Sequence, residues 1–154
     1  MKKAKKLLVV VVAVIAVIFA LLFLPPRLTK TFSKQKAFSY VQNNQTELTR
    51  LAQDIIDGKI RTPYQQEDYT VQYFKSPSAV SEPIVEFSGQ GFGIAPSGYY
   101  TGFYYSPKDI PVRYNGIGTA MEPYKNGWAY HEAGDNHGYT EKICDSWYWF
   151  EFYF

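Results

Sequence analysis

The sequence predicts an α+β protein in which an N-terminal transmembrane helix is followed by one long amphipathic helix packed on an antiparallel β-meander. Three observations predict this fold class. An unbroken apolar run is long enough to cross a bilayer, apolar residues then recur at helical spacing, and the remaining chain consists of short β-type runs separated by turn residues. The 154 residues therefore divide into a basic cytoplasmic tip (1–6), a transmembrane anchor (7–24) and a single extracytoplasmic domain (25–154).

The anchor is predicted from eighteen consecutive apolar residues at positions 7–24. At about 1.5 Å per residue this run reaches roughly 27 Å, close to the ~30 Å hydrocarbon core of a bilayer. The run is longer than the apolar part of a cleaved signal peptide and no A-x-A cleavage motif follows, so we expect the anchor to stay on the mature chain. Pro25 and Pro26 end the span, because proline blocks helical hydrogen bonding.

The charges are distributed very unevenly. Residues 1–36 hold eight bases and no acid, whereas residues 37–154 hold eight bases and fourteen acids. An acidic domain repels phosphate backbones, so nucleic acid is not an expected partner, and the Lys and Arg residues that flank the anchor suit lipid head groups. Because four bases lie on each side of the span, charge counting does not orient it. The signal-like start places the N-terminus in the cytoplasm and the domain outside the cell membrane.

Apolar residues recur three, four and seven positions apart across residues 31–57, which predicts a long amphipathic helix that ends at Gly58. A break is expected at Asn44, which could cap a second half together with Glu47. The spacing of seven between Val41, Leu48 and Ile55 fits either packing on the domain core or a coiled coil with a partner. Three such positions do not sustain a coiled-coil assignment.

The chain after residue 68 predicts strands at about 69–154. The β-type runs are 69–74, 84–88, 91–95, 99–105, 120–125, 128–132, 138–144 and 146–154. Turn residues separate most of them, including Asn115-Gly116 and Asn126-Gly127. No helical segment alternates with these runs, which favours an antiparallel sheet over parallel βαβ units.

Aromatic residues make up a quarter of the strand region, 23 of the residues from 64 to 154. They occupy both faces of the last predicted strand, which indicates a central strand or one whose outer face is covered or used. Exposed Tyr and Trp residues can bind a protein partner or stack on a glycan. The residues predicted to form such a binding surface are Tyr99, Tyr100, Tyr104, Tyr105, Trp147 and Trp149.

A metal site is the alternative prediction. If Asn126-Gly127 forms a two-residue hairpin turn, Glu122 faces His131, and the next hairpin places His131 opposite His137. Two imidazoles and a carboxylate form a ligand set used for zinc or non-haem iron. Strand alternation equally places these side chains on the solvent face of the hairpin, where exposed histidines commonly bind no metal. We therefore expect no cofactor and retain a small metal-dependent enzyme only as the alternative function.

Other catalytic patterns are absent from the sequence. There is no G-x-S-x-G elbow and no H-E-x-x-H motif, and a single cysteine, Cys144, excludes an internal disulfide. The composition and motifs thus favour a membrane-tethered binding or accessory domain whose aromatic sheet surface engages a protein or a cell-envelope component. Catalysis is the less favoured function.

Two stretches carry a resemblance to known sequences: GFGIAPSGYYTGFYYSPKDIPV (91–112) and GDNHGYTEKICDSWYWFEFYF (134–154). They resemble a group of small membrane-anchored proteins from gut Firmicutes, in which an N-terminal anchor is likewise followed by a helix. The resemblance implies a bacterial, membrane-tethered protein. It implies no activity and no catalytic residues.

Overall fold

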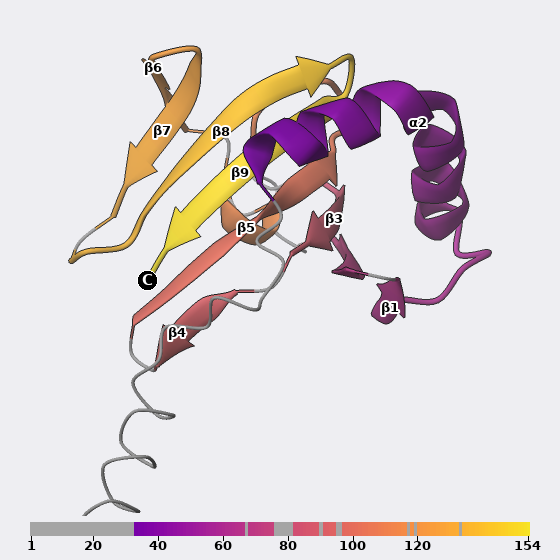
Figure 1. Cartoon of the computed structure of the whole chain (residues 1–154), viewed down its shortest axis with the longest axis horizontal. Helices are drawn as coiled ribbons and strands as arrows, with labels where there is room; N and C mark the ends of the chain where they lie inside the picture. Colours follow the sequence, from indigo (N-terminus) through magenta and orange to yellow (C-terminus); the bar gives the residue numbers. More distant parts are fainter. Residues whose placement is uncertain are drawn as a thin grey trace, which may run out of the picture. The chain divides into compact units, whose positions relative to one another are not determined.

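A computed structural model describes residues 33–154, except 67, 76–81, 90, 95–96, 117, 119 and 133. These residues form one helix packed on an antiparallel sheet, so the predicted α+β class is confirmed (Figure 1). The predicted tip (1–6) and anchor (7–24) lie outside the described residues. Within the described part of the chain, no helix has the length and apolar character needed to cross a membrane.

The predicted long helix is α2, Lys34–Ile56. It begins where the Ser33 side chain accepts a hydrogen bond from the backbone N–H of Lys36 at 3.4 Å, an N-cap interaction. The residues of its buried stripe are Ala37, Val41, Leu48, Ala52 and Ile55. The apolar spacing of seven is therefore explained by packing on the domain's own core.

The predicted break in the helix is present as a kink at Asn44, where φ is −121°. The Asn44 side chain does not cap the second half. Its Nδ2 donates to the Tyr40 carbonyl oxygen at 2.8 Å. The kink bends α2, and both halves keep buried residues on the sheet (Figure 1).

The strands agree closely with the predicted runs. They are β2 (Tyr69–Phe74), β3 (Ile84–Ser88), β4 (Phe92–Ile94), β5 (Ser97–Tyr105), β6 (Glu122–Tyr124), β7 (Gly127–His131), β8 (His137–Cys144) and β9 (Trp147–Tyr153). Two elements were not predicted: the short strand β1 (Tyr64–Gln66) and the 3-10 turn η1 (Tyr114–Gly116). At η1, Asn115 and Gly116 both have positive φ, as expected of the Asn-Gly turn signal.

The sheet is not the simple meander that the sequence predicted. Its strand order is β1-β2-β3-β5-β9-β8-β7-β6, with β4 added beside β5, and all neighbours are antiparallel. The chain runs through one meander to β5, crosses to the far edge and returns through a second meander that ends at β9. The last strand therefore lies at the centre of the sheet, one of the two arrangements expected from aromatics on both of its faces.

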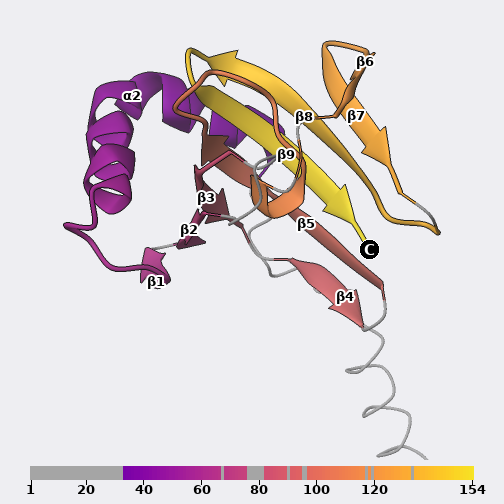
Figure 2. The same cartoon turned by 180° about the vertical axis from the view of Figure 1, so that it is seen from behind.

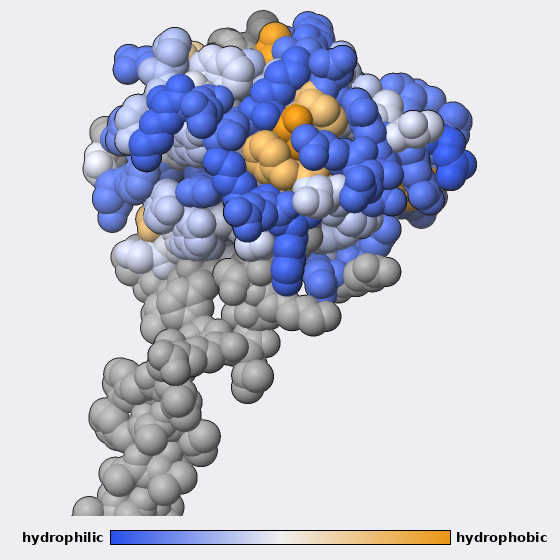
Figure 3. Space-filling model, turned by 45° about the horizontal axis from the view of Figure 1, so that its top comes forward, coloured by the Kyte–Doolittle hydropathy of each residue, from blue (hydrophilic) through white to orange (hydrophobic). Residues whose placement is uncertain are grey.

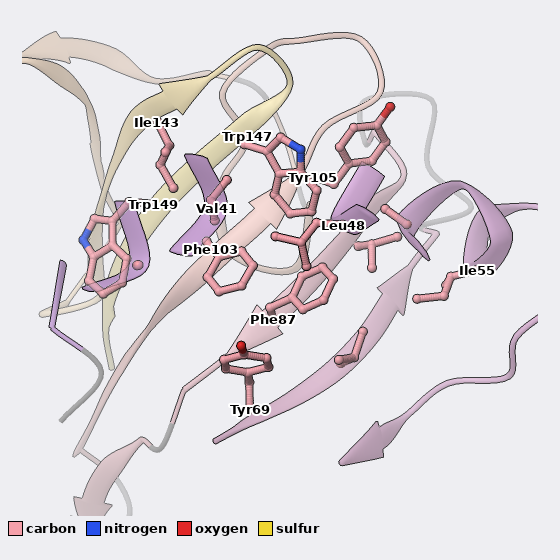
Figure 4. Close-up of a cluster of buried hydrophobic side chains, with 14 residues drawn as sticks. Val41, Leu48, Ile55, Tyr69, Phe87, Phe103, Tyr105, Ile143, Trp147 and Trp149 are labelled. Carbon is pink, nitrogen blue, oxygen red and sulfur yellow. The ribbon is translucent and has the colours of Figure 1, made fainter. Parts of the chain in front are cut away.

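Each face of the sheet has its own core. On one face α2 covers a cluster that includes Phe87, Phe103 and Trp147 (Figure 4). On the other face the connection that follows β5 lies across the sheet (Figure 2), and its residues Ile110, Val112 and Tyr114 pack with Tyr104 and Phe150. Over much of their length both faces of the central strands are thus buried, which accounts for most of the aromatic content.

Candidate functional site

Four of the six predicted binding residues belong to these cores. Trp147 is fully buried and Trp149 is 2% exposed in the cluster beneath α2, together with Tyr105 (Figure 4). Tyr104 is 1% exposed on the opposite face. Side chains buried to this extent cannot contact a partner at the surface. The prediction that these four residues form a binding surface is therefore wrong.

Tyr104 is held by a continuous chain of buried hydrogen bonds. Its hydroxyl accepts from the Val112 N–H at 3.0 Å and lies 3.0 Å from Thr140 Oγ1, which donates to the Trp149 carbonyl oxygen at 2.7 Å. This chain ties the covering connection to β5, β8 and β9. Burial raises the pKa of Tyr104, so its hydroxyl stays protonated within the chain. The role of Tyr104 is structural.

The other two predicted residues, Tyr99 and Tyr100, lie on opposite faces of β5. Tyr99 begins a row of rings that crosses four strands on the face that also carries α2. Its members are Tyr99 (β5), Tyr153 (β9), His137 (β8) and His131 (β7), named here the ring row. His131 is exposed and the other three are partly exposed. The ring row is the candidate functional site.

The ring row lies beyond the part of the sheet that α2 contacts. Along β9, Tyr153 is four residues past Trp149, or about 13 Å in an extended strand. In Figure 1, α2 covers one end of the strands, whereas the C-terminus that follows Tyr153 marks the other end. Because side chains alternate between faces, Trp147, Trp149 and Tyr153 share a face, but only the first two lie in the helix-covered cluster.

Neighbouring rings of the row contact one another. His137 and Tyr153 are stacked with centroids 4.5 Å apart and an interplanar angle of 6°, and His131 follows 5.7 Å from His137 at 18°. Tyr99 lies 4.6 Å from Tyr153 at 37°. Stacking of this kind uses the ring faces within the row, and His137 Nδ1 lies 2.6 Å from the Asp135 carbonyl oxygen. The site is therefore suited to hydrogen bonding.

Acidic side chains border the ring row. Glu151, two residues before Tyr153 on β9, accepts a hydrogen bond from Trp149 Nε1 at 3.1 Å. Burial and then the Glu151 carboxylate raise the pKa of the Tyr99 hydroxyl, which therefore remains a neutral donor at physiological pH. Burial also raises the pKa of Tyr139, whose hydroxyl donates to Glu141. The surroundings thus combine hydroxyl donors with carboxylates.

The described surface carries few large apolar side chains. Tyr100 and Tyr124, at 39% and 50% exposure, are the exposed large hydrophobic residues among those described. The view in Figure 3 shows a mainly hydrophilic surface with a small hydrophobic group near its centre and scattered hydrophobic atoms elsewhere. The candidate surface is thus made of amphipathic rings rather than an aliphatic patch.

The predicted metal ligands are only partly brought together. His131 pairs with His137, as predicted, but Glu122 pairs with Ala129 instead of His131. The turn lies one residue earlier than predicted, at Lys125-Asn126, and Gly127 belongs to β7, so the partner of Glu122 moves by two residues. Among the described residues, no group of three or more His, Cys, Asp and Glu side chains is placed to hold a metal ion.

In this register Gly127 lies against the neighbouring strand. A Cβ atom at this position would lie 2.0 Å from the Thr140 backbone oxygen on β8, so only glycine fits where the two strands approach. Lys125 consequently takes the positive-φ turn position, with φ of 53°. The Asn-Gly signal predicted the hairpin correctly and misplaced its turn by one residue.

In comparisons with known proteins, no family model, no curated protein and no solved structure matches this chain. Sequence reasoning missed Tyr153, Tyr139 and Glu151. The sequence signal for Tyr153 is the length of the last strand, β9, which extends beyond the residues that α2 covers.

Proposed function

We propose that this chain is a membrane-tethered binding domain that projects outside the cell membrane and engages a protein partner through the ring row. The observation that carries the proposal is the continuous row of four contacting rings, placed beyond the helix-covered part of the sheet. The apolar segment 7–24 and its flanking bases supply the tether. A tethered domain with an accessible sheet face is suited to binding beside the bilayer.

The chemistry of the surface favours a basic, donor-rich protein segment. Glu151 and Glu122 lie on the same face as the ring row, and residues 37–154 carry six more acids than bases. Complementary charge speeds association and sets specificity. A glycan would stack on exposed ring faces, whereas the inner rings of this row already face one another. Tyrosine edges, by contrast, are common in protein interfaces.

The alternative of a metal-dependent enzyme gains no support from the geometry. Its proposed carboxylate, Glu122, faces Ala129 and not His131. The ring row offers hydrogen-bond donors and acceptors but no activated nucleophile, so binding is the function it supports best.

The tether can be tested by labelling introduced cysteines. The side chain of Asp145, in the β8–β9 turn, is 92% exposed. In a Cys144→Ser background, we expect Asp145→Cys to react with a membrane-impermeant maleimide on intact cells, and Lys3→Cys to react only after permeabilisation. The labelled protein should stay in the membrane fraction. The reverse labelling pattern would contradict the orientation, and recovery in the soluble fraction would contradict the tether.

The binding surface can be tested with a photo-crosslinker in the full-length, membrane-bound chain. A benzophenone side chain at His131 is expected to give one discrete protein adduct, and the same group at Asp145 is expected to give none. Raising salt to about 1 M shortens electrostatic screening to about 3 Å and should reduce the adduct, because the proposed partner is basic. Equal adducts from both positions, a glycan adduct or no adduct at His131 would reject the proposal.

A further inference from the structure

The face of the sheet opposite α2 carries a cavity of about 670 Å³. This size lies within the range of small-molecule binding sites, about 300–1,000 Å³. It is formed by β2, β3 and β5 together with η1. Among the residues that line it are Thr70, Gln72, Glu86, Ser88, Tyr100 and Tyr114. It lies on the other side of the sheet from the ring row.

The cavity contains one buried carboxyl group. Glu86 is 3% exposed and lies between Val85 and Phe87 on β3. The Ser88 hydroxyl donates to its Oε1, whereas its Oε2 is buried and has no hydrogen-bond partner. Burial raises the pKa of Glu86 to about 7, against the lowering effect of the Ser88 hydrogen bond. A buried oxygen left without a partner is costly, and a ligand that donates to it would remove that cost.

The other lining residues restrict the charge of such a ligand. Asp68 adds a second carboxylate, and none of the described lining residues is Lys, Arg or His. An anion would therefore be repelled. The Tyr100 and Tyr114 rings, with centroids 6.3 Å apart, offer faces that favour a cation and edges that accommodate an alkyl chain.

We propose that this cavity binds a small aliphatic amine, with its ammonium group donating to Glu86 Oε2. The hydroxyl and amide groups of Thr70 and Gln72 supply further acceptors on the β2 side. This site is separate from the ring row, so the proposal stands or falls independently of the proposed protein partner.

Binding of an ammonium group is coupled to ionisation of Glu86. The protonated carboxyl must release its proton before it accepts from the ammonium, so binding below pH 7 releases about one proton to solvent. The other titratable groups that face Glu86 are Tyr104 and Tyr114, whose pKa values are raised, together with Tyr100 and the exposed Asp68. Affinity should fall about tenfold for each pH unit below 7.

The test is calorimetric titration of the full-length protein in detergent with putrescine, cadaverine and spermidine. The matched neutral probe is 1,4-butanediol, which has the chain length of putrescine without its charges. We expect binding of at least one amine, none of the diol, and proton release at pH 6 measured in buffers of different ionisation enthalpy. Glu86→Gln should weaken amine binding on the order of thirtyfold, as expected when one partner of a buried charge pair is removed.

Two controls keep the result interpretable. Asp68→Asn leaves Glu86 in place and should reduce affinity much less than Glu86→Gln, and Glu47→Gln, on α2, should have no effect. The pH dependence of the unmodified protein needs no variant, so the proposal remains testable if Glu86→Gln unfolds. Absence of binding by all three amines, equal binding of the diol, or affinity independent of pH between 5 and 8 would overturn the proposal.

Discussion

Replacing Trp147 by alanine is expected to lower the free energy of unfolding by about 4 kcal/mol, a typical value for truncating a fully buried aromatic side chain. Trp147 has no exposed surface and packs against the rings of Phe87, Phe103 and Tyr105, with centroids 5.2 to 5.9 Å apart. Its Nε1 also donates to Thr49 Oγ1 on α2 at 3.1 Å. The substitution would leave a cavity at the junction of helix and sheet. Urea unfolding of the full-length chain in detergent, followed by circular dichroism, measures the loss.

Two control substitutions separate packing from binding. Trp147→Phe keeps most of the ring volume and should recover a large part of the stability. Tyr124→Ala, at a half-exposed position, should change the free energy of unfolding by less than about 1 kcal/mol. If Trp147→Ala left stability unchanged and abolished partner binding, Trp147 would be the surface residue that the sequence analysis predicted.

The local elements of this fold are predictable because their signals are local. The spacing of Val41, Leu48 and Ile55 identifies one buried stripe on a helix, and the structure buries all three. The runs at 69–74 and 84–88 coincide with β2 and β3, since β-branched and aromatic residues there lie between turn residues. Helix and strand periodicity need no knowledge of the remaining chain.

The strand order is not local and could not be predicted in this way. Pairing of β5 with β9 joins residues about fifty positions apart, and nothing in either strand specifies the partner. The aromatic residues on both faces of β9 indicated a central strand. They did not indicate that the irregular connection after β5, through Ile110, Val112 and Tyr114, covers one of those faces. The burial of Tyr104 and Tyr148 follows from that connection.

In the candidate sites, too, the local features were predictable from the sequence and the non-local ones were not. Pairing of His131 with His137 was predictable from hairpin arithmetic, whereas the position of Glu122 depends on where the preceding turn lies, with Gly127 packed closely against β8, and no sequence motif reports that contact. Glu86 stands in the sequence as a single acid among apolar neighbours, Val85 and Phe87. That contrast was the available signal for a buried carboxyl group, since an acid inside an apolar strand is rarely left without a role.

The protein is expected to lose stability as the pH rises from about 4.5 to 7, and Glu86→Gln is expected to abolish this loss. Burial raises the pKa of Glu86 from 4.5 to about 7 in the folded chain. Between these values the folded state holds a proton that the unfolded state has released, so each pH unit costs the folded state about 1.4 kcal/mol. The stability contributed by protonated Glu86 is complete below pH 4.5 and disappears above pH 7.

Glu86→Gln should therefore exceed the unmodified chain in free energy of unfolding by about 3 kcal/mol at pH 8 and match it near pH 4, because glutamine resembles the protonated carboxyl at every pH. The control is Glu151→Gln beside the ring row, where we expect no such gain. Burial acts to raise the pKa of Asp109, but its hydrogen bond from Lys142 contributes to a net lowering. The stability that Asp109 contributes is therefore lost in more acidic solution, and this loss is the same in all variants. Urea unfolding from pH 4 to 8 gives the two curves, and parallel curves for Glu86→Gln and the unmodified chain would show that folding does not change the pKa of Glu86.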